Sequence, residues 1–81
     1  MDLEQQKKVR EEIIHRFATN LKRIREAAKL TPEEVDEKCG FQPGTVAGAE
    51  TGEIIITLGA IDRIADALEC TASELLQRLQ L

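Results

Sequence analysis

The chain has 81 residues, of which 42% are hydrophobic and 32% are charged, and its net charge is −4. This length allows one small domain, and the composition is that of a helical globular protein with only two aromatic residues for its core. No apolar run approaches the roughly 18 residues of a membrane span, and the N-terminus lacks a signal peptide's apolar segment. We therefore expect a cytoplasmic protein with no membrane partner.

The charges are unevenly distributed along the chain. Residues 1–29 hold eight Lys or Arg against five Asp or Glu, whereas residues 30–81 hold three against ten. No basic residue lies between Lys38 and Arg63. A surface that binds a polyanion therefore has to draw most of its cations from the first third of the chain.

Catalytic and metal sites are not expected. His15 is the only His, and no nucleophile has a base at a recognisable spacing. Cys39 and Cys70 are 31 residues apart, which fits no zinc motif, so we interpret them as buried, reduced thiols. The sequence thus predicts neither an enzyme nor a bound metal or cofactor.

The first predicted helix covers residues 3–28, which contain no Pro or Gly. Its apolar residues fall at helical spacing: Val9, Ile13, Phe17, Leu21, Ile24 and Ala28. This stripe predicts either one long helix or a short leading helix joined to a second near residues 18–20. We assign residues 1–16 to an N-terminal helical extension and residues 17–81 to the main domain.

Capping signals define the next two predicted helices. The segment TPEE at residues 31–34 has Thr as the N-cap, Pro at the first helical position and Glu three residues after the cap. That helix should stop at Gly40. A third, shorter helix should open at Gln42-Pro43 and end at Gly52.

Two more helices complete the predicted all-α bundle of five or six helices. Thr57 can cap a fourth helix, and a capping-box pattern at Thr71 starts a fifth. The predicted apolar face of the fourth helix consists of Leu58, Ile61, Ile64, Ala65 and Leu68. The leucines of the fifth serve either the core or a dimer seam: Leu75, Leu76, Leu79 and Leu81.

A family resemblance extends from Leu21 to Leu76, over LKRIREAAKLTPEEVDEKCGFQPGTVAGAETGEIIITLGAIDRIADALECTASELL. This run resembles the Cro/C1-type helix-turn-helix domain, or XRE family, and Glu50 and Gly52 match the E-x-G that closes the family's third helix. The resemblance implies a lambda-repressor-like bundle and a homodimeric, DNA-binding transcriptional regulator. It also implies that the third helix enters the major groove. The compact length and the TVAGAETG segment are most similar to the controller proteins of restriction-modification systems.

Few side chains around the third helix suit base reading, which favours Arg, Lys, Asn or Gln. Only Gln42 and Thr45 can hydrogen-bond to a base edge there. The candidates for contacts with the DNA backbone are Lys22, Arg23, Lys29 and Lys38, with Arg25 as a further cation of the first helix. Acidic residues flank the face and disfavour DNA: Glu33, Glu34, Glu37, Glu50 and Glu53.

The same segment permits a second interpretation, in which the fold has lost DNA binding and serves as a protein-protein interaction module. Gly44 and Gly48 would admit either DNA or a protein partner, or they reflect loose selection on a surface helix. Three consecutive residues, Ile54, Ile55 and Ile56, cannot all face inward from a short connection. They either form a partner or dimer surface, together with Leu79 and Leu81, or pack beneath the N-terminal extension.

Overall fold

The structure is a computed structural model that describes residues 1–79. This part of the chain contains no strand and five helices: α1 (Leu3–Ala27), α2 (Pro32–Cys39), α3 (Thr45–Thr51), α4 (Leu58–Ala67) and α5 (Ala72–Leu76). The predicted all-α class is confirmed with five helices; the alternative of six is wrong for these residues, because the first stripe forms one helix. None of the five is long and apolar enough to cross a membrane.

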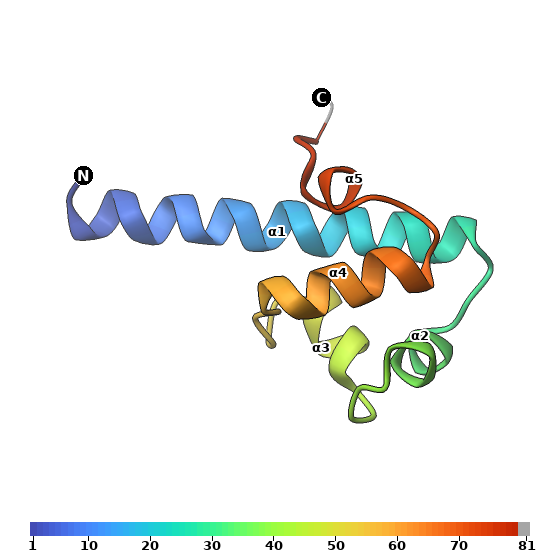
Figure 1. The fold of residues 1–81 in the computed structure, drawn as a ribbon. Coiled ribbons are helices and arrows are strands. Elements are labelled where there is room, and N and C mark those ends of the chain that lie inside the picture. Colours follow the sequence, from blue (N-terminus) through green and yellow to red (C-terminus); the bar gives the residue numbers. More distant parts are fainter. Residues whose placement is uncertain (80–81) are drawn as a thin grey trace.

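Helix α1 is the longest element, and its first half extends beyond the rest of the bundle (Figure 1). It starts at a capping box in which Asp2 accepts from the Gln5 N–H at 2.8 Å and the Asp2 N–H donates to the Gln5 side chain. No residue breaks the helix before Lys29, which has a left-handed backbone with φ of 61°. The buried side chains of α1 all lie in its second half, from Phe17 onward.

The core lies between the second half of α1 and the other four helices. Its buried residues come from every helix: Phe17, Leu21, Val35, Cys39, Val46, Ala49, Ile61, Ile64, Ala65, Leu68 and Leu75. The predicted apolar face of α4 is wrong at Leu58, whose side chain is 83% exposed. Leu58 is the first residue of α4, so the apolar stripe continues about one turn beyond the buried core.

The cysteines are both free thiols. Cys39 is buried in the core, whereas Cys70 is only partly buried beside it. Desolvation raises the pKa of both thiols above the ordinary value, which favours the protonated form at neutral pH.

Helix α3 begins later than the sequence predicts. Gln42 and Pro43 lie in the turn before the helix, and the first helical residue is Thr45. The reason is Gly44, whose φ of 88° lies in the left-handed region and cannot belong to a right-handed helix. The predicted end at Gly52 is confirmed, since Gly52 also has a left-handed backbone, with φ of 82°.

The C-terminal segment is held against α1 by a buried amide. Asn20 is 1% exposed, and its Nδ2 donates to the carbonyl oxygens of Leu75 at 3.1 Å and Gln77 at 2.8 Å. Helix α5 ends at Leu76, so Leu79 lies beyond the helix. The prediction that Leu79 belongs to the fifth helix is therefore wrong. Leu81 lies outside the described residues.

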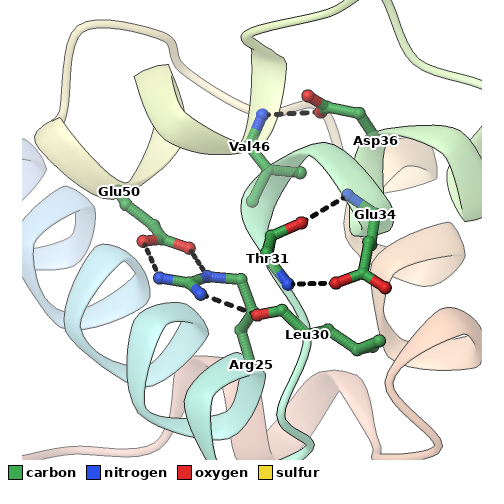
Figure 2. Close-up of polar contacts among 7 residues, drawn as sticks. All are labelled: Arg25, Leu30, Thr31, Glu34, Asp36, Val46 and Glu50. Atoms are coloured by element: carbon green, nitrogen blue, oxygen red, sulfur yellow. Dashed lines mark hydrogen bonds and ion pairs between the residues drawn. The ribbon is translucent and has the colours of Figure 1, made fainter.

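A buried ion pair joins α3 to α1 (Figure 2). Arg25 donates from Nε to Glu50 Oε2 at 2.6 Å and from Nη2 to Glu50 Oε1 at 3.0 Å. Its third nitrogen, Nη1, donates to the Leu30 carbonyl oxygen at 2.8 Å, which fixes the α1–α2 turn shortly before α2 begins. The Arg25 and Glu50 side chains are only 11% and 9% exposed.

Removing one partner of this pair should be costly. We expect Arg25→Met to lower the free energy of unfolding by about 3–5 kcal/mol, because Glu50 would stay buried without a counter-ion. Arg25→Met combined with Glu50→Leu should recover part of that loss, since an apolar pair needs no desolvation of charge. Urea unfolding followed by circular dichroism measures both, with Lys22→Met on the exposed face of α1 as the control. A double variant no more stable than Arg25→Met alone would contradict the pairing.

Candidate nucleic-acid interface

The helix-turn-helix unit consists of α2, the turn over residues 40–44, and α3. Gly40 ends α2 as predicted, with a left-handed backbone and φ of 70°. The Phe41 N–H donates to the Asp36 carbonyl oxygen at 2.9 Å and starts the turn. Val35 of α2 and Val46 of α3 are both fully buried, so the two helices pack as one unit.

Asp36 on α2 caps the start of α3 (Figure 2). Its carboxylate accepts from the Val46 N–H at 2.8 Å and from the Gly44 N–H at 3.0 Å, and the residue is only 4% exposed. Gly44, the N-cap residue, has no side chain for this role. A carboxylate at this position also suits the positive end of the helix dipole.

This cap limits how α3 can meet a phosphate. The Gly44 and Val46 amides are bonded to Asp36, and the Thr45 N–H donates to the Gln42 carbonyl oxygen at 3.2 Å. Three successive amides at the start of α3 are therefore satisfied inside the protein. Backbone phosphate binding there would have to displace a buried carboxylate.

The two base-contact candidates lie together at the exposed start of α3. The Thr45 hydroxyl donates to the Gln42 carbonyl oxygen at 2.6 Å, which fixes the backbone between them. Gln42 is exposed and Thr45 is half-buried. Because the Thr45 hydrogen is used internally, its oxygen remains as an acceptor, while the Gln42 amide offers both donor and acceptor groups.

Gly44 and Gly48, at the start and in the middle of α3, have different surroundings. The space beside Gly44 is open, with no atom within 4 Å of an added Cβ. The space beside Gly48 is filled by Ile54, whose Cγ1 would lie 2.7 Å from an added Cβ, and the Ile54 N–H donates to the Gly48 carbonyl oxygen at 3.1 Å. The close approach that Gly48 permits is thus made by the chain itself.

The isoleucine run divides between the core and the surface. Ile56 packs against the core, whereas Ile54 and Ile55 are 39% and 68% exposed. The prediction that the three cannot all face inward is confirmed. Ile55 also lines an apolar hollow with Val9 and Ile13 of α1.

The candidate cations are spread over the molecule. Lys22 and Arg23 of α1 line a hollow together with Glu50 of α3. Lys38 lines a different hollow together with Arg63 of α4, and Lys29 is exposed in the α1–α2 turn. Lys38 is thus the one candidate cation that belongs to the helix-turn-helix unit itself.

Two expectations about charge are wrong. Arg25 cannot clamp DNA, because its guanidinium is buried against Glu50 and the Leu30 carbonyl. Glu50 therefore does not contribute a free negative charge to the outer face. The pair removes one cation and one anion together, so the balance of free charge is unchanged, and the remaining exposed acidic flanking residues are Glu33, Glu34, Glu37 and Glu53.

The start of α2 is an acidic capping box, as predicted (Figure 2). The Glu34 N–H donates to the Thr31 hydroxyl at 3.1 Å, and the Thr31 N–H donates to Glu34 Oε1 at 2.9 Å. The hydrogen bond from the Thr31 backbone lowers the pKa of Glu34. The first turn of α2 therefore holds its own anion, which disfavours a DNA phosphate at the same place.

Asp36 is the residue of this site that sequence reasoning missed. Its signal is weak: an acidic residue directly after Val35, on the side of α2 that carries the buried residues. Its partners lie eight and ten residues further on, beyond a turn whose geometry the sequence does not specify.

Asp36→Ala should destabilise the protein by about 1–3 kcal/mol, because two N–H groups at the start of α3 lose their acceptor. For a domain of this size, each kcal/mol lowers Tm by roughly 4–8 °C. Thermal unfolding of Asp36→Ala and of Glu37→Ala, an exposed neighbour on α2, provides the measurement and its control. Equal losses in the two variants would exclude the capping role.

The capping box should make stability depend on pH in the acidic range. The folded pKa of Glu34 lies below its ordinary value of 4.5, so its stabilisation is full above pH 4.5 and is lost as the pH falls through the lower folded pKa. Glu34→Gln keeps the hydrogen bonds but cannot titrate. We expect the Tm difference between wild type and Glu34→Gln to be constant above pH 5 and to shift in favour of the variant below pH 4.5. A constant difference from pH 7 to 3 would contradict this.

Comparisons with known proteins agree with this architecture. Residues 16–79 match the model of a family described as the helix-turn-helix domain. Among solved structures, the fold is similar to the hypothetical transcription factor NHTF from Neisseria, with a TM-score of 0.78 and 27% sequence identity over 82% of this chain and 76% of that one. Comparison with curated proteins found no match. The predicted Cro/C1-type resemblance is consistent with both matches, and the chain belongs to the helix-turn-helix domain family.

Proposed function

We propose that this protein is a DNA-binding transcriptional regulator that acts as a homodimer. In each subunit, the exposed start of α3 meets base edges in the major groove, with Gln42 as the main reader and Thr45 as a secondary acceptor. Lys22, Arg23, Lys29 and Lys38 are the cations proposed to meet the DNA backbone.

The observation that carries the proposal is the geometry at the start of α3. The chain has the helix-turn-helix unit of its family, and the Asp36 cap fixes the start of α3 within that unit. The amide of Gln42, which can both donate and accept, is exposed next to Thr45. The pairing of Glu50 with Arg25 supports it further, because it fixes α3 to α1 through a buried contact. A hypothetical transcription factor of similar fold adds support from outside the chain.

A second candidate is a protein-protein interaction module on the same fold. It is favoured by the amides of α3, which are already satisfied, and by the lack of basic residues between Lys38 and Arg63. The exposed Ile54 and Ile55 would then belong to the partner surface. The two candidates differ in whether duplex DNA binds at all.

Selection from random duplexes at low salt tests the proposal. We expect enrichment of a two-fold symmetric site, and an affinity that falls as the salt concentration rises, with few phosphates neutralised per subunit. Gln42→Ala should weaken binding to the selected site by about 5- to 150-fold, the range of one good base contact, and relax the preference at the same position in each half-site.

Thr51→Ala, at the exposed end of α3 away from Gln42, serves as the matched control and should keep the preference. Lys22→Ala should weaken binding to all sequences alike and make the salt dependence shallower. If no duplex binds even at low salt while the protein remains folded, the interaction module is the better account.

A further inference from the structure

The exposed apolar side chains gather at one end of the molecule. In the described part of the chain, the large exposed ones are confined to Met1 with the first half of α1, and to the segment from the α3–α4 connection to the first residue of α4. They are Met1, Leu3, Val9, Ile13, Ile54, Ile55 and Leu58. A patch of this kind, on a helix that extends beyond its own bundle, marks an interaction surface.

The patch includes a groove that leads toward the core. A hollow of about 380 Å³ lies along α1 and is lined by Val9, Ile13 and Ile14 together with Ile55. A smaller hollow of about 80 Å³ continues from the same residues to Phe17. The patch thus combines a helix that projects from the bundle with an apolar hollow along its side, and most residues that line the hollow belong to that same helix.

We infer that this patch is where a second copy of the chain docks, with the first halves of the two α1 helices packed antiparallel across a two-fold axis. The inference rests on the homodimer of the proposed function and specifies its surface. A two-fold interface requires a self-complementary patch, and one apolar helix face that packs antiparallel on its own copy meets that requirement.

The polar residues of the groove support an antiparallel register. In a two-fold pair, a register that sets Leu3 opposite the partner's Ile13 also sets Gln6 opposite the partner's Arg10. Gln6 and Arg10 are the polar residues that line the groove, and within residues 1–79 Arg10 makes no ion pair. The Gln6 amide donates to the Met1 carbonyl at 3.2 Å, which leaves its oxygen as an acceptor for a guanidinium.

The area of the patch is of the order that a dimer needs. The exposed fractions of its seven side chains are together equivalent to about four fully exposed aliphatic residues, which is on the order of several hundred Å² of apolar surface. A standard interface takes about 800 Å² from each partner, somewhat over half of it apolar. Leu79, near the C-terminus, is half-buried and lies in a hollow with Arg23 and Arg78, apart from this patch.

Sedimentation equilibrium over a range of protein concentrations tests the surface. Ile13→Glu should raise the dimer dissociation constant at least tenfold, whereas His15→Glu, two residues along on the exposed face of α1, should leave it unchanged. Leu3→Glu is a second variant that cannot disturb the core, because Leu3 is 82% exposed. Circular dichroism checks that each variant remains helical.

The register has its own test. Leu3→Cys with Ile13→Cys should give an intermolecular disulfide under mild oxidation, whereas Leu3→Cys with His15→Cys should not. A wild-type dimer that tolerates both Ile13→Glu and Leu3→Glu overturns the inferred surface and leaves the homodimer standing. A wild type that is monomeric at all concentrations overturns both the surface and the homodimer, while DNA reading by Gln42 is judged separately by the duplex selection.

Discussion

The guanidinium of Arg25 is the group on whose contacts the placement of α3 depends. Its three nitrogens bind the Glu50 carboxylate and the Leu30 carbonyl, so one planar group fixes α3 and the α1–α2 turn to the same point of α1. A charged pair this deeply buried gives little net stability, yet it tolerates no loss of one partner. It therefore acts mainly on geometry, because it sets α3 at one position relative to α1.

Local signals predicted most of the fold. Thr31, Thr57 and Thr71 cap helices as expected, because a hydroxyl that accepts from an amide three residues later needs no distant partner. The stops at Gly40 and Gly52 follow from backbone freedom alone. The start of α3 was predicted too early, because Gln42-Pro43 is a good helix opening by itself. Only the left-handed Gly44 and the two hydrogen bonds that Gly44 and Val46 donate to Asp36 on the preceding helix move the start to Thr45.

The candidate site was less predictable for the same reason. Gln42 and Thr45 are three residues apart, so any turn into a helix keeps them close. The pairing of Arg25 with Glu50, by contrast, joins residues 25 positions apart and depends on how α1 and α3 cross. Periodicity likewise predicted which face of α4 is apolar but not where the core ends, so Leu58 was placed inside. The reason for a glycine at position 48 could not be predicted from the sequence. The side chain that fills the space beside it, Ile54, belongs to the connection after α3.

The continuity of α1 links the two ends of the molecule mechanically. Arg25 lies 15 positions after Arg10 in the same unbroken helix, which at about 1.5 Å per residue makes a lever of roughly 22 Å. Any contact that holds the first half of α1 consequently sets the tilt of the whole helix, and the second half of the same helix carries Arg25, which holds α3. By the same rise per residue, a tilt of about 10° would move Arg25 by roughly 4 Å, comparable to the spacing between adjacent base pairs.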